Sequence, residues 1–294
     1  MECMFESDTK PMMRSFVRAA LVLAALTVAA PAAFAQQRPL QTEDPEVIGA
    51  GRILLEAGVD YKRDVSFPVS GLRGNLFSVP SLGVSVGVSS IAEIQIDGGF
   101  YQKLSITGRT AAPFSPLLEL DGASTADVDD FNLGAKIRFL SEGARRPSMA
   151  VRFSTRLPNA SNESGLGKDM QDFTASILAG KTVQSIRVVM NVGLLILGNP
   201  TRPAAQDDLL VYSLSVARAI SAGGEVVGEF VGRANFASIV TQGAEDRGLL
   251  RFGMRYTTAG VRLDGGILLG LTSRDPQIGF TTGFTWVFNA FRVP

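Results

Sequence analysis

The most constraining feature of this sequence is a two-residue alternation that runs through its C-terminal segment, residues 261–288. Large apolar side chains occupy one face, and small, polar or charged residues occupy the other; the apolar set is Val261, Leu263, Ile267, Leu269, Leu271, Phe280, Phe284, Trp286 and Phe288. A period of two predicts β-strands with different surroundings on their two faces. An aromatic face opposite a small or charged one is typical of strands between lipid and a polar lumen. The segment therefore predicts a transmembrane β-hairpin with a polar turn at 272–277.

The same alternation recurs along the chain from Gly51 onward. We expect about twelve strands, which begin near Ile53, Leu82, Ile94, Phe131, Met149, Phe173, Ile186, Leu210, Glu225, Leu250, Val261 and Phe280. The segment 225–235 is the weakest, because Val227 and Val231 fall on its expected inner face. An even number of strands is the rule for bacterial outer-membrane barrels.

The lengths of the connections alternate as well. Short connections are expected at 89–90, 141–147, 183–185, 221–224 and 258–260, and mostly longer ones at 64–75, 103–127, 158–171, 198–207 and 236–246. A soluble sandwich has no reason to keep this order, whereas an outer-membrane barrel has short periplasmic turns and longer extracellular loops. We predict an all-β fold: a single closed antiparallel up-and-down transmembrane β-barrel over 51–288, followed by a C-terminal tail at 289–294.

The N-terminal residues resemble a secretory signal. Arg14 and Arg18 precede a short apolar core, and an A-x-A-type cleavage site ends at Ala35. An uncleaved anchor would need about 20 apolar residues, more than this core provides. We therefore predict a signal peptide at 1–35, with translation starting at Met12 or Met13. The polar segment 36–50 is expected to be a periplasmic lead-in to the barrel. An exported protein with a predicted transmembrane barrel is expected in the outer membrane of a Gram-negative bacterium.

Composition excludes several kinds of chemistry. The chain has no histidine and one cysteine, Cys3, so neither a Ser–His pair nor a Cys/His metal site can be built. Equal numbers of acidic and basic residues, 28 of each, give no reason to propose a nucleic-acid partner. A carboxylate-only or Ser–Lys enzyme remains open, but we predict that the protein is not an enzyme and needs no cofactor or metal.

Charged residues on the expected inner face are the candidate functional residues. One group is acidic and the other basic: Glu56, Asp60, Glu93 and Asp97 against Lys136, Arg138, Arg152, Arg156 and Arg187. If the two groups occupy separate arcs of the wall, they create a transverse field across a watery pore. Alternatively, they pair with neighbours and plug the interior. Six further inward charges are compatible with either arrangement: Glu229, Arg233, Arg251, Arg255, Arg262 and Asp264.

The end of the last strand resembles the C-terminal assembly signal of outer-membrane proteins. A polar residue is followed two positions later by glycine and then by alternating aromatic residues; these positions are Thr281, Gly283, Trp286 and Phe288. The sequence departs from that signal because residues 289–294 follow it. The resemblance implies that the outer-membrane assembly machinery is a partner.

Most of the chain after the signal is similar to a transporter-like outer-membrane family described as phenol-degradation meta-pathway proteins. The resemblance is carried by 39–45, which leads into 51–58, and by 270–280. The family implies a barrel in outer-membrane lipid and a channel for small aromatic or apolar compounds. The sequence therefore favours passive passage of a small solute. A non-conducting structural or adhesive barrel, whose external loops bind a partner, is the alternative.

Overall fold

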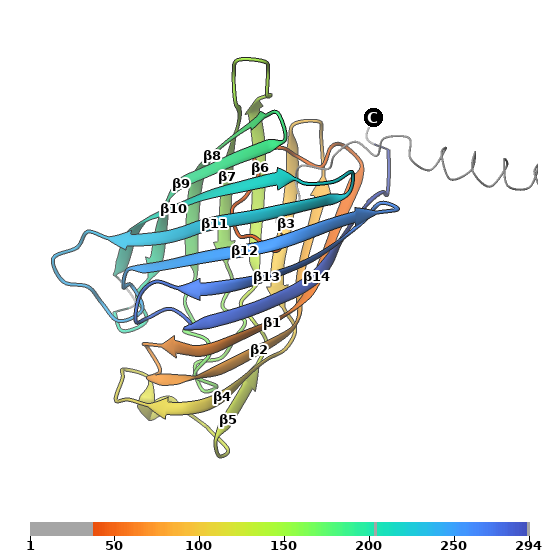
Figure 1. Cartoon of the computed structure of the whole chain (residues 1–294). Helices are drawn as coiled ribbons and strands as arrows, with labels where there is room; N and C mark the ends of the chain where they lie inside the picture. Colours follow the sequence, from red (N-terminus) through yellow and green to blue (C-terminus); the bar gives the residue numbers. More distant parts are fainter. Residues whose placement is uncertain (1–37, 203–204, 293–294) are drawn as a thin grey trace, which may run out of the picture. The chain divides into compact units, whose positions relative to one another are not determined.

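The computed structural model of this protein describes residues 38–202 and 205–292, so the expected signal peptide lies outside the described residues (Figure 1). Twelve strands form the wall of a barrel. They are β1 (Arg52–Phe67), β2 (Leu72–Gly87), β3 (Ala92–Gly99), β6 (Asn132–Leu140), β7 (Ser148–Arg156), β8 (Asp172–Val183), β9 (Ile186–Gly198), β10 (Gln206–Ala219), β11 (Gly224–Asn235), β12 (Arg247–Thr258), β13 (Val261–Gly270) and β14 (Ile278–Asn289). Among these residues, no helix is long and apolar enough to span a membrane.

The wall closes because the first and last strands pair with each other. β1 is antiparallel to β14, from Arg52 opposite Asn289 to Arg63 opposite Ile278, and it pairs with β2 on its other edge. The remaining wall strands pair with their neighbours in chain order. Closure leaves no unpaired edge inside the membrane, as a spanning sheet requires. The predicted twelve-stranded antiparallel barrel is therefore confirmed.

Two of the expected external loops contain strands, which corrects the sequence prediction. The 64–75 loop shrinks to a turn at 68–71, and 103–127 contains β4 (Gln102–Arg109), a short 3₁₀ helix (Ser115–Leu117) and β5 (Ser124–Asp127). β4 pairs with the external half of β2, whereas β3 pairs with its periplasmic half. Pro80 lies at this change of partner, where its missing N–H costs no ladder bond. The sequence predicted loops here because both segments are rich in residues that favour turns. Pairing with β2, which is a tertiary contact, makes them strands instead.

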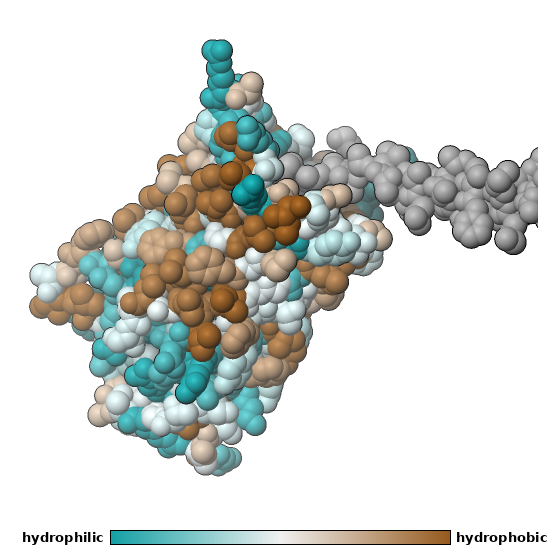
Figure 2. Space-filling model, viewed as in Figure 1, coloured by the Kyte–Doolittle hydropathy of each residue, from teal (hydrophilic) through white to brown (hydrophobic). Residues whose placement is uncertain are grey.

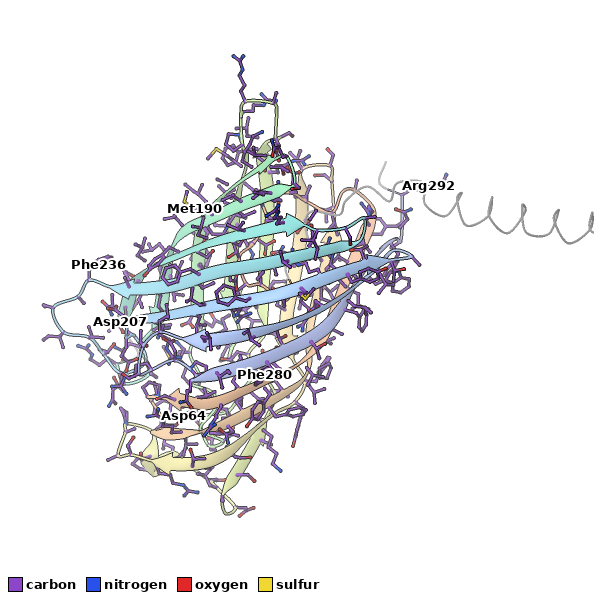
Figure 3. The ribbon with its side chains drawn as sticks, in the orientation of Figure 1. Asp64, Met190, Asp207, Phe236, Phe280 and Arg292 are labelled. Atoms are coloured by element: carbon purple, nitrogen blue, oxygen red, sulfur yellow. The ribbon has the colours of Figure 1, made fainter. Side chains whose placement is uncertain are left out.

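The outer surface of the barrel is apolar. Large hydrophobic side chains are exposed along the wall, including Ile94, Ile137, Phe153, Met190, Phe252 and Trp286. Apolar residues gather across the middle of the face shown in Figure 2, and Met190 and Phe280 project outward in Figure 3. Exposure of this kind is expected where acyl chains replace water.

The external end of the barrel has a small apolar core of its own. Val65, Leu72, Leu76 and Leu104 are buried, and Leu166 packs against them from the 158–171 loop. Ser70 Oγ donates a hydrogen bond of 2.7 Å to the carbonyl oxygen of Gly165 in the same loop. A Cβ on Gly165 would lie 2.6 Å from Leu72, and its φ is +74°, so this contact requires glycine. The loop thus folds over the external mouth rather than extending away from it.

Candidate functional site

Residues 38–48 lie inside the barrel, which corrects the expectation of a periplasmic lead-in. The backbone N–H of Ile48 donates to Glu93 of β3 at 2.8 Å, near the periplasmic end. Further into the lumen, the N–H groups of Gln41 and Thr42 each donate to Glu229 of β11 at 2.8 Å. The segment has no periodic pattern, so its sequence shows no sign of its partners. Its contacts become evident only when the wall surrounds it.

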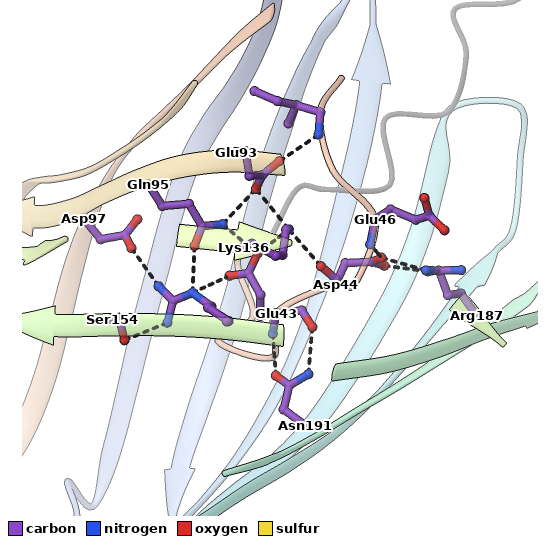
Figure 4. A network of polar contacts seen from close by, with 12 residues as sticks. Glu43, Asp44, Glu46, Glu93, Gln95, Asp97, Lys136, Ser154, Arg187 and Asn191 are labelled. Atoms are coloured by element: carbon purple, nitrogen blue, oxygen red, sulfur yellow. Dashed lines mark hydrogen bonds and ion pairs between the residues drawn. The ribbon is translucent and has the colours of Figure 1, made fainter. Parts of the chain in front are cut away.

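The acidic residues of this segment meet basic residues of the wall (Figure 4). The ion pairs are Glu43 with Lys136, Asp44 with Arg187 and Glu46 with Arg138. The Asp44 carboxylate accepts from Arg187 Nε at 2.5 Å and from Nη2 at 2.6 Å, a bidentate arrangement. Negative charge carried by the inserted segment therefore balances much of the basic arc predicted from sequence.

Lys136 is a fully buried charge of the lumen. Its side chain is 0% exposed, and its Nζ lies 2.7 Å from Glu43, 3.0 Å from Glu93 and 2.9 Å from the carbonyl oxygen of Asp44. These contacts match the three donors of an ammonium group. Because a buried charge is tolerated only when it is paired and hydrogen-bonded, this cluster fixes the inserted segment to the wall.

The acidic and basic sets are in contact rather than separated across the lumen. Glu93 and Lys136 are directly opposite each other on β3 and β6. Arg152 Nε donates to Gln95 at 2.7 Å, and Arg152 also lies 3.5 Å from Asp97 and 3.7 Å from Glu43. The acidic and basic residues therefore do not form two separate arcs on this side of the lumen. Neighbouring strands carry the opposite charges, and these charges form pairs.

A second cluster surrounds Arg38 on the β1, β2 and β14 side of the lumen. Arg38 donates to Ser81 Oγ at 3.0 Å and to Thr281 Oγ at 2.9 Å, and its Nε is 3.4 Å from Asp264. Glu56 accepts a bond of 2.9 Å from Thr285 and one of 3.4 Å from the Arg38 N–H. Position 283 must be glycine here, since a Cβ would lie 2.3 Å from the backbone carbonyl oxygen of Ala57 and 2.7 Å from Arg38 Nε.

Three further arginines form a ladder along the β11–β13 wall. Arg251 Nε is 3.5 Å from Glu229, and Arg255 Nε donates to the carbonyl oxygen of Arg38 at 2.7 Å. Arg255 and Arg262 both face Glu225, at 3.9 Å and 3.7 Å. The predicted inward-facing arginines thus interact with carboxylates of the wall and with the backbone of the inserted segment.

Two cavities remain in the lumen beside the inserted segment. The larger one, about 570 Å³, lies toward the external end, and the smaller one, about 420 Å³, lies beside residues 38–41 and contains Asp60 and Asp97 in its wall. Gln41, Lys62, Arg251 and Leu268 line both cavities. Because these four residues line both spaces, the two cavities are neighbours and the four residues lie between them.

The wall of the larger cavity is apolar and cationic. Its basic residues are Lys62, Arg156, Lys168, Arg233, Arg247 and Arg251, and its carboxylates are Asp129, Asp130 and Asp275. Arg156 pairs with Asp172 and lies 3.6 Å from Asp130, while Lys168 Nζ is 2.7 Å from Asp172. Sequence reasoning missed Lys168 and Arg247, because one lies in an expected external loop and the other precedes the start of the alternation in its strand.

The four residues of the expected assembly signal lie on β14. Thr281 and Gly283 face the lumen beside Arg38. Trp286 and Phe288 stack with ring centroids 4.4 Å apart, and Trp286 is exposed on the outer surface. Their role in assembly stays a prediction. Among residues 38–202 and 205–292, no group of three or more potential ligands could hold a metal ion.

Comparison with known proteins gives fold similarity without a sequence family. No family model and no curated protein sequence matches the chain. Among solved structures, an outer-membrane channel from Pseudomonas putida F1 is similar, with a TM-score of 0.60 and 13% identity over 83% of this chain and 98% of that chain. The NanC porin has a TM-score of 0.49 and 8% identity, covering 81% and 100%. The closed wall, its apolar outer surface and the first of these similarities identify an outer-membrane β-barrel.

Proposed function

We propose that this protein is a channel through which small solutes cross the outer membrane passively. The observation that carries the proposal is the pair of neighbouring cavities, of about 570 and 420 Å³, that share Gln41, Lys62, Arg251 and Leu268. They leave open space from the external end to mid-lumen, alongside the inserted segment, and a solute that moves from one to the other would pass the four shared residues. Pore dimensions and the polar groups in the wall then select what passes.

The chemistry of the cavity wall supports a solute with an apolar part. Val65, Leu76, Leu197, Leu249 and Leu268 line the larger cavity together with its basic residues. Ligand sites of this kind combine an apolar surface with a few polar groups that fix orientation. The resemblance to phenol-degradation outer-membrane proteins adds aromatic compounds to the solutes that should be tested first.

Liposome swelling and planar-bilayer conductance test the proposal directly. Vesicles containing the purified barrel should swell faster in phenols or small carboxylates than in sugars of similar size, because the larger cavity offers apolar and cationic surface. A discrete single-channel current should appear in the bilayer. A correctly folded protein that gives neither swelling nor current would refute passive transport.

The inserted segment supports a second candidate, a non-conducting barrel that has a structural or adhesive role. Ion pairs from Glu43, Asp44 and Glu46 hold the segment across the periplasmic half of the lumen. The variant Glu43→Gln/Asp44→Asn/Glu46→Gln removes these charges and should loosen the segment. A current that appears only in this variant would favour the plugged barrel, whereas a wild-type current that the variant enlarges would favour the channel.

A matched control removes three acidic groups from the external loops. Glu119, Asp121 and Glu163 are exposed, so Glu119→Gln/Asp121→Asn/Glu163→Gln should leave the current unchanged. If both triple variants changed the current equally, the effect would come from net charge rather than from the inserted segment.

A further inference from the structure

Arg233 and Arg247 form an unusual pair at the external end of the lumen. They lie directly opposite each other on the neighbouring strands β11 and β12. Like charges at facing positions of adjacent strands repel and destabilise a sheet. A pair of this kind is expected to have nearby carboxylates that neutralise it.

Within the described residues, neither arginine forms an ion pair, and their hydrogen bonds go to backbone carbonyls. Arg233 donates from Nε to Glu245 at 2.9 Å and from Nη2 to Gly243 at 2.8 Å. Arg247 Nη2 donates to Ser66 at 3.5 Å, while its buried Nε has no partner in the part of the chain that the structure describes. Carbonyl groups satisfy donors but carry no net charge. The carboxylates of Glu245 and Asp275 attract both guanidinium groups from a distance, but neither forms an ion pair with them. The repulsion between the two arginines is therefore only partly offset within the described chain.

Both arginines line the larger cavity, where further basic groups come from other elements. Arg156 enters from β7 and Lys168 from the 158–171 loop, and Asp172 pairs with both of them. Burial, together with the charges of Arg156 and Arg233, lowers the pKa of Lys168 to about 8 against the opposing effect of Asp172. Arg233 is therefore close enough to act electrostatically on Lys168 in the 158–171 loop, which crosses the external mouth of the barrel.

The rest of the cavity wall indicates what kind of anion would fit. Phe67, Val69, Leu166 and Leu249 line the same space of about 570 Å³. A hydrated inorganic ion gains nothing from such a surface, whereas an organic anion buries its apolar part there. The planar guanidinium forks match the geometry of a carboxylate.

We propose that Arg233 and Arg247 form a binding subsite for the carboxylate of a small aromatic or similarly apolar organic acid. The apolar body of the acid lies against the hydrophobic part of the cavity wall, and its charge neutralises the arginine pair. The inference rests on the proposed function in one respect, since it places the subsite on the path of the solute.

Isothermal titration of the full-length protein in detergent tests the subsite with three probes. Sodium benzoate carries both a ring and a carboxylate, benzyl alcohol lacks the charge, and sodium acetate lacks the ring. Benzoate should bind roughly tenfold or more tightly than benzyl alcohol, because hydrogen bonds to charged groups are the stronger ones. Benzoate should also bind more tightly than acetate. Equal affinities for benzoate and benzyl alcohol would overturn the proposal, and equal affinities for benzoate and acetate would refute the apolar part of the site.

Variants assign the binding to the two arginines. Arg233→Gln/Arg247→Gln should lose the preference for benzoate over benzyl alcohol. Arg145→Gln/Arg146→Gln removes two exposed arginines from the turn between β6 and β7 and should retain it. Circular dichroism checks folding, and the single variant Arg247→Gln tests the same point if the double variant does not fold. Wild-type benzoate binding by folded Arg233→Gln/Arg247→Gln, or by folded Arg247→Gln, would contradict the assignment.

The binding measurement is independent of transport. Benzoate binding by a barrel that carries no current would keep the subsite and reject the channel. A current without benzoate binding would keep the channel and reject the subsite.

Discussion

Lys136 of β6 and Glu43 of the inserted segment form an ion pair of 2.7 Å in which the lysine side chain is 0% exposed and the glutamate side chain 5%. Neither residue could remain charged at such a depth alone, because desolvation of an unpaired ion costs several kcal/mol. The pair therefore explains why a segment with no secondary structure has one defined position in the lumen.

The first prediction concerns the stability of this pair. Glu43→Gln leaves Lys136 with Glu93 as its remaining carboxylate partner. We expect the free energy of unfolding to fall by roughly 3 kcal/mol, the lower end of the range for breaking a buried pair. Urea unfolding in lipid vesicles measures this change. Glu163→Gln, at an exposed loop position, is the control and should have no effect; a loss of equal size there would contradict the explanation.

The second prediction concerns the boundary between the two cavities. Leu268 on β13 is 5% exposed and lines both spaces, whereas Leu263 on the same strand is 52% exposed on the outer surface. Leu268→Trp should reduce the swelling rate several-fold, because the indole fills space at the boundary that a solute has to cross. Leu263→Trp adds the same group on the lipid side and should not change the rate. Unchanged permeation in Leu268→Trp would show that solutes do not pass this point.

The third prediction tests the assignment of the two faces. Met190 on β9 is 49% exposed on the outer surface, and Ser213 on β10 lines the larger cavity. Met190→Arg should destabilise the barrel in vesicles by roughly 2–4 kcal/mol if the residue lies near the bilayer midplane. Ser213→Arg should cost less, because its charge enters a polar lumen. The reverse order of stabilities would contradict the orientation of the wall.

The fourth prediction is a pH dependence at Lys168. Its pKa in the folded protein is lowered from 10.5 to about 8, chiefly by burial. Between these two values the unfolded chain binds more protons at this position, so the free energy of unfolding should rise with pH. The melting temperature of wild type minus that of Lys168→Met should therefore increase from pH 8 to pH 10. A flat or falling difference would show that the loop does not bury this ammonium group.

Much of the wall could be predicted from sequence because the barrel imposes a local rule. Each strand meets lipid on one face and the lumen on the other, so Ile137 and Phe153 lie outside while Lys136 and Arg152 point inside. Even the weak segment around Val227 is a wall strand, β11, because its neighbours on both sides supply hydrogen-bond partners.

The contents of the lumen could not be predicted in the same way. The position of Glu43 depends on Lys136, Gln95 and Asn191, which belong to three different strands. Such contacts leave no periodic trace in the sequence. Lys168 and Arg247 were missed for a similar reason, since the cavity that joins them forms only when the 158–171 loop folds over the mouth.

The hydrogen bond from Arg38 to Thr281 joins residues 243 positions apart in the chain. Contacts with such large sequence separation form late in folding, after most of the loop-closure entropy has been lost. Since β14 must be in place before Arg38 can meet Thr281, this contact depends on closure of the wall. A barrel that still lacks its last strand therefore cannot hold Arg38 in its final position.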